Sequence, residues 1–238
     1  MTYMDTLVVV PTYNERENIE RIIEAVAAQG CDVLVIDDGS PDGTGDLVIA
    51  KAPKVAGRVF LIRRHGKLGL GTAYADAFTW VLANQPSYKT IVQMDADFSH
   101  PPEALPYLIE SANASGIAIG SRYVPGGQTP DWPWYRQMLS RVANFYARAI
   151  INMRFGHFHV HDATAGFVAW RRDVLAKTFA KPVISDGYAF QIEAKFRATR
   201  LGYKPVELPI TFRDRTKGRS KISHGIIWET LLLPWRLR

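Results

Sequence analysis

Two aspartates one residue apart, Asp95 and Asp97, stand between a β-prone stretch at 90–94 and the prolines Pro101 and Pro102. Alternate residues of a strand face the same way, so both carboxylates can reach one ion. Oxygen ligands without histidine or cysteine favour Mg²⁺ or Mn²⁺, ions that keep several waters and bind substrate phosphates. Because such a pair also arises by chance, and because Asp97 could instead cap the next helix, the neighbouring motifs must decide its meaning.

Two more polar clusters follow predicted strands. The first, at 11–15, has the sequence PTYNE, and the second, at 37–43, has the sequence DDGSPDG. In a parallel sheet these clusters would meet 95–97 at one edge, where so many carboxylates are costly to bury unless cations or hydrogen-bond donors offset them. The two aspartates that open the second cluster suit contact with a ribose or a base, and Tyr13 suits stacking on a base.

Short β-branched runs alternate with helical patterns through the first half of the chain. This alternation is typical of an α/β fold with a Rossmann-like, mostly parallel sheet flanked by helices, in which ligands bind beyond the carboxyl ends of the strands. Asn14 followed by Glu17 resembles a capping box at the start of the first helix. The second half is less regular, and no linker clearly divides the chain. The predicted strands are 7–10, 33–37, 59–62, 90–94, 116–120, 166–170 and 206–212, and the predicted helices are 19–26, 69–84, 102–112, 135–152 and 189–201.

The composition sets limits on the class of protein. The 238 residues are 47% hydrophobic, which allows a substantial core, and the single cysteine, Cys31, excludes an intramolecular disulfide and fits a reducing compartment. We expect no signal peptide and no membrane-spanning helix, because the N-terminus has no basic region and no apolar run reaches about 18 residues. The net charge is +6, and residues 195–238 hold 11 Lys or Arg against three acids. This basic end suits a phosphate-bearing partner or a solvated surface.

The ordered set of motifs resembles the family 2 glycosyltransferases with the A-type fold and, more narrowly, the polyprenol-phosphate (dolichol-phosphate) mannose synthases. The resemblance covers nearly the whole chain and is far more specific than any one motif. It is carried by PTYNE (11–15), VIDDGSPDGT (35–44), GLGTAY (69–74), MDADFSHPP (94–102), GSRY (120–123), WPWYR (132–136), DATAGF (162–167), GYAFQIE (187–193) and DRTKGRSKI (214–222).

The resemblance implies inverting transfer of mannose from GDP-mannose to a polyprenyl phosphate by a single domain, 1–238, with a nucleotide-sugar-binding half at 1–120 and an acceptor-binding half at 121–238. It implies Mg²⁺ or Mn²⁺ as cofactor, held by Asp95 and Asp97. Ser99 stands where the family often has a glutamine as third ligand. The family's nucleotide-sugar contacts fall on Pro11, Tyr13, Glu15, Ile36, Asp38, Ala96 and Asp97, with Arg215 and Lys221 near the donor pyrophosphate.

The acceptor chemistry needs no strong base. A phosphate monoester is already ionised near neutral pH, with a second pKa of about 6, so electrostatic placement can replace proton removal. Arg122, Arg136 and Ser140 are the candidates for holding the acceptor phosphate, because the family pattern places them there and arginine matches phosphate with two prongs. The expected catalytic residues are therefore Asp97, Arg122 and Arg136.

A lipid acceptor requires contact with a membrane. The helix predicted at 135–152 and the carboxyl-terminal segment at 223–238, which contains Trp228 and Trp235, are amphipathic and could lie in a membrane interface or pack on the sheet. We expect a cytoplasmic protein that is peripheral at the cytoplasmic face of a membrane, attached by itself or through an anchoring subunit, with no nucleic-acid partner.

Three alternatives stay open from the sequence. A polyprenyl phosphate glucose synthase would use UDP-glucose on the same fold. A nucleotidyltransferase would need a basic glycine-rich loop after the first strand, which PTYNERENI is not. A non-catalytic binder of nucleotide or nucleic acid would exploit the basic end, but aromatic side chains do not alternate with the basic residues there as a stacking platform requires.

Overall fold

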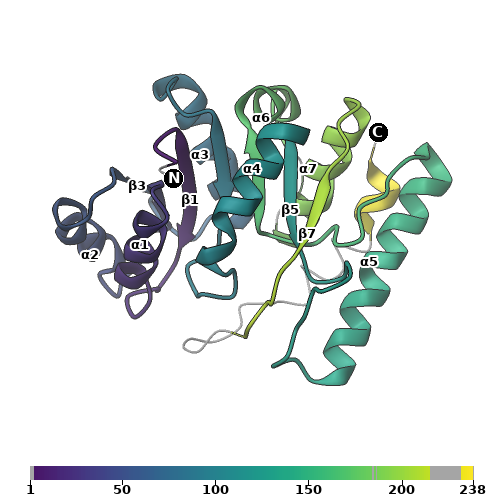
Figure 1. Cartoon of the computed structure of the whole chain (residues 1–238), viewed down its shortest axis with the longest axis horizontal. Helices are drawn as coiled ribbons and strands as arrows, with labels where there is room; N and C mark the ends of the chain where they lie inside the picture. Colours follow the sequence, from purple (N-terminus) through teal and green to yellow (C-terminus); the bar gives the residue numbers. More distant parts are fainter. Residues whose placement is uncertain (1–2, 184, 186, 215–231, 238) are drawn as a thin grey trace.

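The computed structural model describes residues 3–183, 185, 187–214 and 232–237, and the statements below concern these residues. A seven-stranded sheet with the order β3-β2-β1-β4-β6-β5-β7 crosses the molecule (Figure 1). Every neighbouring pair is parallel except the two pairs that β6 makes with β4 and β5. This mostly parallel α/β sheet is the architecture that the sequence predicts.

The elements follow one another in mostly alternating order. The strands are β1 (Thr6–Thr12), β2 (Asp32–Asp37), β3 (Val59–Arg63), β4 (Thr90–Gln93), β5 (Ile117–Ser121), β6 (Val168–Arg171) and β7 (Val206–Pro209). The α-helices are α1 (Ile19–Ala28), α2 (Thr44–Lys51), α3 (Leu70–Asn84), α4 (Leu105–Ser115), α5 (Trp134–Phe155), α6 (Arg172–Thr178) and α7 (Gly187–Arg200), and short 3-10 turns span Ala52–Lys54 and Pro102–Ala104.

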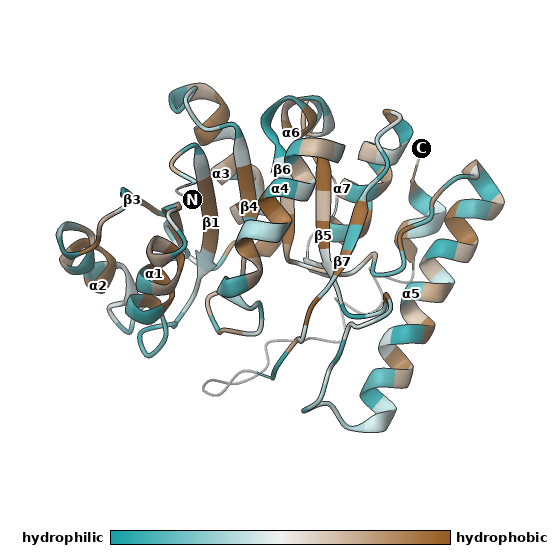
Figure 2. Ribbon diagram, in the orientation of Figure 1, coloured by the Kyte–Doolittle hydropathy of each residue, from teal (hydrophilic) through white to brown (hydrophobic). Residues whose placement is uncertain are grey.

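Helices cover both faces of the sheet, so the core lies in two layers, one on each face. In β1, Leu7 and Val9 face a core shared with α3, α5, α6 and α7, whereas Val8 and Val10 face a core shared with α1, α2 and α4. All four residues are fully buried, as expected for a strand whose two faces are both covered. The hydropathy colouring shows these apolar strands at the centre of the molecule (Figure 2).

The first helix begins where its periodicity predicts, but the predicted capping box is wrong. Helix α1 begins at Ile19 with Asn18 at its N-cap, not with a capping box of Asn14 and Glu17. Asn14 instead adopts a left-handed conformation with φ of 56°, and its backbone N–H donates to Ser40 Oγ at 3.0 Å. The chain after β1 is therefore used to tie two loops together before the helix begins.

Helix α5 forms one flank of the molecule, with residues 232–237 beside it (Figure 1). Trp235 Nε1 donates to the Tyr146 hydroxyl at 2.8 Å, and Arg154 Nη1 donates to the Pro234 carbonyl at 2.6 Å. Leu233 is buried in the core on that face of the sheet. Within the described ranges, no helix combines the length and the hydropathy needed to cross a bilayer.

The packing around β5 leads to a stability prediction. A Cβ on Gly120 would lie 2.7 Å from Phe167 Cδ1 and 3.2 Å from Ile210 Cγ2, whereas a Cβ on Gly66 would meet nothing within 4 Å. Overpacking of a core costs about 1–3 kcal/mol, so Gly120→Ala should lower the free energy of unfolding by that amount. Gly66→Ala, the matched control, should stay within about 0.5 kcal/mol of wild type in urea unfolding. Equal midpoints and slopes for the two variants would contradict this account of the core.

Candidate active site

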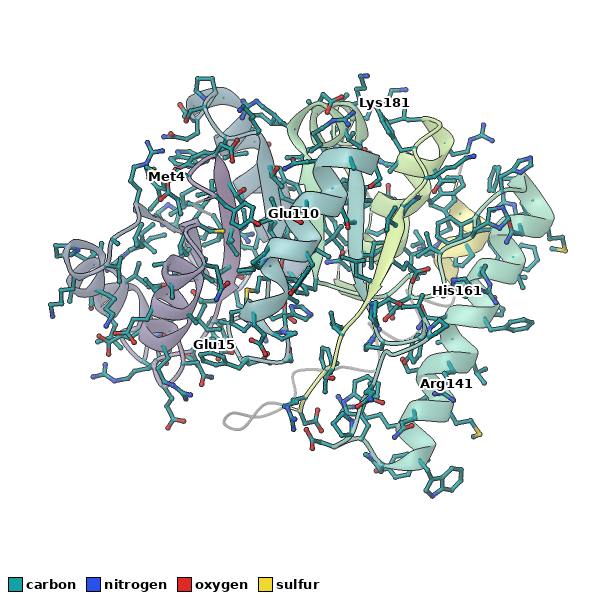
Figure 3. All side chains as sticks on the ribbon, viewed as in Figure 1. Met4, Glu15, Glu110, Arg141, His161 and Lys181 are labelled. Atoms are coloured by element: carbon teal, nitrogen blue, oxygen red, sulfur yellow. The ribbon has the colours of Figure 1, made fainter. Side chains whose placement is uncertain are left out.

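Three polar loops meet at the carboxyl edge of the sheet because β2, β1 and β4 are neighbours. The loops follow Thr12, Asp37 and Gln93, the last residues of these strands. Glu15 marks this edge on the lower side of the left half of the molecule in Figure 3. The structure therefore brings together the three acidic clusters that the sequence placed at one edge.

The aspartate pair is held by its own loop. Asp97 is buried, and its Oδ1 accepts the Ser99 N–H at 3.1 Å. The Asp95 N–H donates to Nδ1 of His100 at 3.0 Å, and Nε2 of that ring lies 4.0 Å from Asp95 Oδ2. His100 also stacks on Phe167 at 5.0 Å between ring centres, which fixes the plane of the imidazole.

Two buried side chains beneath the pair respond to its charge. Burial lowers the pKa of His100, although Asp95 and Asp97 oppose the shift, so the ring is neutral and can accept at Nδ1. Burial, together with the charges of the same two aspartates, raises the pKa of Tyr74 well above its ordinary value, so the phenol keeps its proton. Neither residue was among the candidates from sequence, although both stand in motifs that were singled out, GLGTAY and MDADFSHPP.

The residues at this loop fit a hard divalent ion. The Ser99 hydroxyl is buried and forms no hydrogen bond with the described residues, so a polar atom without a partner stands in the loop that carries the two aspartates. No group of three His, Cys, Asp or Glu side chains gathers as a metal site in the described ranges. An all-oxygen set of two carboxylates and a hydroxyl is what Mg²⁺ or Mn²⁺ takes when substrate phosphates and waters complete its shell.

The two aspartates of the second loop have different partners. Asp37 is occupied within the loop, since its carboxylate accepts from Thr12 Oγ1 at 3.1 Å and from Ser40 Oγ at 2.5 Å. Asp38 Oδ1 lies 3.0 Å from Arg64 Nη1, and its Oδ2 accepts the Leu68 N–H at 3.1 Å. Burial raises the pKa of Asp38, and Arg64 and the loop N–H groups only partly offset it.

The first loop places Tyr13 and Glu15 beside these residues. The Glu15 N–H donates to Thr44 Oγ1 at 3.0 Å, which ties the loop to the start of α2. Lys67 Nζ lies 5.2 Å from the centre of the Tyr13 ring. Pro11 pairs with Ile36 across β1 and β2. The Ile36 side chain is fully buried in the core, as Ala96 nearly is, so a ligand in the crevice would meet mainly the backbone of these residues.

On the other side of the aspartate pair, a buried ion pair joins β5 to the loop before β6. Arg122 donates from Nε to Asp162 Oδ2 at 2.7 Å and from Nη2 to Asp162 Oδ1 at 2.6 Å, and it also reaches Thr164 Oγ1 at 2.8 Å. Asp162 is fully buried, which raises its pKa, but the charge and hydrogen bonds of Arg122 outweigh burial and lower the pKa overall. The ion pair sets the orientation of the Arg122 guanidinium.

Arg136 and Ser140 lie on α5 and are also engaged. Arg136 Nη1 donates to both carboxylate oxygens of Asp214 at 2.8 Å, and its guanidinium carbon lies 4.1 Å from the centre of the Trp132 ring. Ser140 Oγ accepts the Tyr123 hydroxyl at 2.5 Å. Residues from three separate segments therefore meet near Arg122. Arg215 and Lys221, which the sequence assigns to the donor pyrophosphate, lie outside the described residues.

Lys195 was missed by sequence reasoning. It is fully buried on α7, and its ammonium group donates to the carbonyls of Ala163 at 3.1 Å, Ala165 at 2.7 Å and Gln191 at 3.3 Å. It thereby fixes the loop that carries Asp162. A lysine between apolar helix positions gives no signal in the sequence that it will be buried, because its three partners are backbone carbonyls.

The comparisons with known proteins identify the class. The Glycosyl transferase family 2 profile matches residues 7–179. The chain belongs to this family, and it is a glycosyltransferase. The family assignment favours sugar transfer over the nucleotidyltransferase and non-catalytic alternatives.

Relatives narrow the comparison to polyprenol-phosphate mannose synthases. The polyprenol monophosphomannose synthase of Mycolicibacterium smegmatis is 45% identical over 238 residues, which cover 98% of this chain and 87% of the relative. The undecaprenyl-phosphate mannosyltransferase of Micrococcus luteus is 42% identical over 233 residues, with coverage of 96% and 92%. The dolichol-phosphate mannosyltransferase of Pyrococcus furiosus is 37% identical over 242 residues, with coverage of 98% and 64%.

Solved structures confirm the A-type glycosyltransferase fold. The glucosyl-3-phosphoglycerate synthase of Mycobacterium tuberculosis, in complex with Mn²⁺, UDP and glucosyl-3-phosphoglycerate, superposes with a TM-score of 0.65 at 19% identity, covering 98% of this chain and 80% of that one. The same enzyme with Mg²⁺ and UDP superposes with a TM-score of 0.64 at 20% identity, with the same coverage. At this identity the likeness shows the fold alone.

Lys195 yields a prediction for stability against pH. Burial lowers its pKa from 10.5 to about 7, Arg122 adds to this, and Asp162 and Glu207 oppose it. Between these two values the unfolded chain holds more protons than the folded one, so Lys195 makes the free energy of unfolding rise with pH. Lys195→Met should flatten the profile from about pH 7 to pH 10 relative to wild type in urea unfolding.

Lys54→Met, at an exposed lysine, is the control and should leave the profile parallel to wild type. If the free energy of unfolding of Lys195→Met rose with pH as steeply as that of wild type, the prediction would be wrong, and the Lys195 ammonium group would be hydrated in solution.

Proposed function

We propose that this protein transfers mannose from GDP-mannose to the phosphate of a polyprenyl phosphate, with inversion at the sugar carbon, releasing GDP. The observation that carries the proposal is the position of Asp95, Asp97 and the buried Ser99 hydroxyl between the loops of β1 and β2 on one side and the Arg122–Asp162 ion pair on the other. The names of the three relatives support the sugar and the class of acceptor.

The donor nucleotide occupies the crevice along the first two loops. The Tyr13 ring offers a face for stacking, and Glu15 and Asp38 offer acceptors for ribose or base N–H and O–H groups. The backbone beside Pro11 and Ala96 permits close approach. GDP rather than UDP as the nucleotide is part of the proposal.

The reaction breaks the bond between the sugar carbon and the diphosphate while an acceptor oxygen attacks from the opposite face. Negative charge grows on the leaving diphosphate, and a bound Mg²⁺ or Mn²⁺ supplies charge neutralisation there. Asp95, Asp97 and Ser99 would hold that ion. Arg215 and Lys221 add positive charge near the diphosphate in this scheme.

The acceptor phosphate enters from the side of Arg122, Arg136 and Ser140. Because the acceptor is already ionised, these residues need only position it, and no general base is required. The ion pairs that anchor both guanidinium groups hold them in place before the acceptor arrives, which lowers the entropy lost on binding.

The protein attaches peripherally to the cytoplasmic face of a membrane in this proposal, alone or with an anchoring subunit. The outer face of α5 exposes large apolar side chains to solvent, namely Met138, Val142, Phe145 and Met153. A helix with such a face and basic residues beside it is suited to lie in a lipid interface.

The central test is transfer of label from GDP-mannose. With Mg²⁺ or Mn²⁺ and a short polyprenyl phosphate, label should enter the organic phase, and Asp97→Asn should lower kcat by about 10²–10³-fold, as loss of one preorganised charge typically does. Asp173→Asn, an aspartate at the start of α6 that pairs with Arg171, is the control. Transfer that survives Asp97→Asn at the wild-type rate would reject the assigned role of the aspartate pair.

Donor choice is tested separately. Supplied together at equal concentration, GDP-mannose should be consumed and UDP-glucose should not, with nucleoside diphosphate release followed for each nucleotide. Preferential consumption of UDP-glucose would replace the proposed activity by that of a polyprenyl phosphate glucose synthase.

A further inference from the structure

A pocket of about 110 Å³ lies between α5 and the loop before β6, separate from the aspartate pair. It is lined by Tyr123, Arg141, Asn144, Phe145, Arg148 and His161. Tyr123 and His161 are the sequence neighbours of Arg122 and Asp162, so the pocket lies beyond the buried ion pair, on the side toward α5. Two of its lining residues, Tyr123 and Asn144, hydrogen-bond to Ser140, so the pocket adjoins the proposed acceptor residues.

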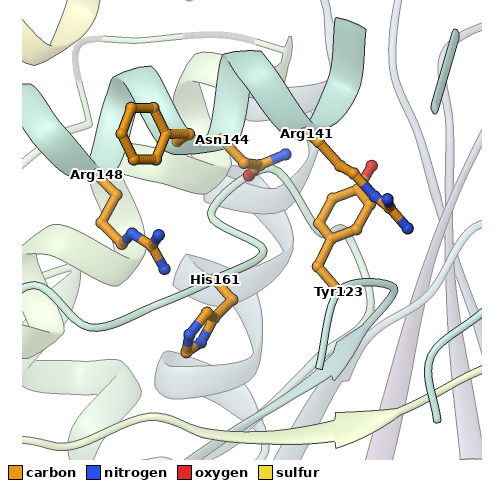
Figure 4. Close-up of a pocket in the computed structure, with 6 residues that line it drawn as sticks. Tyr123, Arg141, Asn144, Arg148 and His161 are labelled. Carbon is orange, nitrogen blue, oxygen red and sulfur yellow. The ribbon is translucent and has the colours of Figure 1, made fainter. Parts of the chain in front are cut away.

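Two arginines supply the charge of this pocket. Arg141 and Arg148 lie two helical turns apart on α5, and their guanidinium groups both project from the helix toward the side of Tyr123 and His161 (Figure 4). Among the described residues neither one forms an ion pair, in contrast to Arg122 and Arg136. Their resolved contacts are with the rings of Tyr123 at 5.9 Å and Phe145 at 6.0 Å.

A carboxylate that contacts the pocket wall is already engaged. Glu207 accepts the backbone N–H of His161 at 2.7 Å, the His161 Nδ1 at 2.9 Å and the backbone N–H of Asp162 at 2.9 Å. It therefore fixes the wall of the pocket, and among the described residues it forms no ion pair with Arg141 or Arg148.

The floor of the pocket is rigid as well. Asn144 is buried and bonds to the Ser140 carbonyl at 2.9 Å, and to the hydroxyl and the N–H of Thr164 at 3.1 Å each. The floor of the pocket is thus fixed, and the exposed Arg141 and the half-buried Arg148 stand at its rim.

The position of the pocket on α5 indicates its occupant. On the helix, Arg141 and Arg148 stand at the border between the buried side, which includes Asn144, and the exposed apolar side chains Met138, Val142 and Phe145. A group that places negative charge in the pocket and hydrocarbon along the exposed face satisfies both features at once. A phospholipid does this, whereas a free phosphate uses only the charge.

We propose that the pocket between Arg141, Arg148 and His161 binds the phosphate of an anionic phospholipid headgroup and so orients α5 on the membrane surface. The proposal rests on the proposed membrane attachment and is independent of the sugar-transfer reaction. The phospholipid is a surface ligand here, not the acceptor.

The test is cosedimentation with phosphatidylcholine vesicles that contain or lack phosphatidylglycerol, with no nucleotide sugar or polyprenyl phosphate present. The double variant Arg141→Gln/Arg148→Gln should bind the anionic vesicles roughly 25-fold more weakly than wild type, since each basic residue near an anionic surface contributes about a fivefold factor. Binding to phosphatidylcholine alone, which reports the apolar face, should change little.

The matched control is Lys54→Gln/Lys204→Gln, which removes the same charge from two exposed lysines away from the pocket. It should weaken binding by less than about threefold, because screening limits charges more than a Debye length from the surface. Equal losses in the two double variants, or no loss in the arginine variant, would overturn the proposal. Circular dichroism melting of each variant checks that it is folded.

A soluble ligand gives a different result. If inorganic phosphate raises the melting temperature of wild type but not of the arginine variant, while both bind vesicles alike, the pocket takes free phosphate and the lipid assignment is wrong. Asp97→Asn should bind vesicles as wild type does. The vesicle result therefore holds or fails whether or not mannose transfer is found.

Discussion

The site depends on compensating a concentration of carboxylates at one edge of a sheet. Parallel strands deliver Asp37, Asp38 and Asp97 to the same edge, where burial makes an uncompensated charge costly. Each is offset by a different means: loop hydroxyls for Asp37, a guanidinium for Asp38, and a backbone N–H beside a buried hydroxyl for Asp97. The loop of Asp97 also holds the Ser99 hydroxyl, which is buried without a hydrogen-bond partner among the described residues. In the proposed function, a cation and a diphosphate would enter there without displacing an internal ion pair.

Much of the first half was predictable from sequence because it is governed by local periodicity. Strands such as β1 and β2 are continuous apolar runs, and the end of each run fixes which loop residues reach the edge. Helix α2 was not predicted, since its eight residues follow a turn of breakers and are too short to show a clear period. The capping box failed because Asn14 serves the neighbouring loop through Ser40, a contact across 26 residues that no local pattern contains.

The proposed acceptor side was less predictable because its contacts are long-range. The partner of Arg122 is 40 residues away and that of Arg136 is 78 residues away. Sequence could indicate which motifs carry these arginines, but not that both are already paired with carboxylates. The direction of β6 was equally hidden: the strand at 166–170 was expected, yet its antiparallel pairing with β4 and β5 is what returns the 162–165 loop to Arg122.

The buried charges of the acceptor side form one connected group. Lys195 holds the carbonyls of Ala163 and Ala165 in the loop before β6. Asp162 of the same loop holds Arg122 at the end of β5, and Thr164 links the loop to α5 through Asn144. Removing any one partner would leave another charge or dipole buried without compensation, which costs more than the net contribution of the contact itself. The loop therefore has little freedom to move independently of α5. In the proposed function, this would keep the part of α5 that lies on the lipid surface at a fixed distance from the loop beside which the acceptor phosphate is placed.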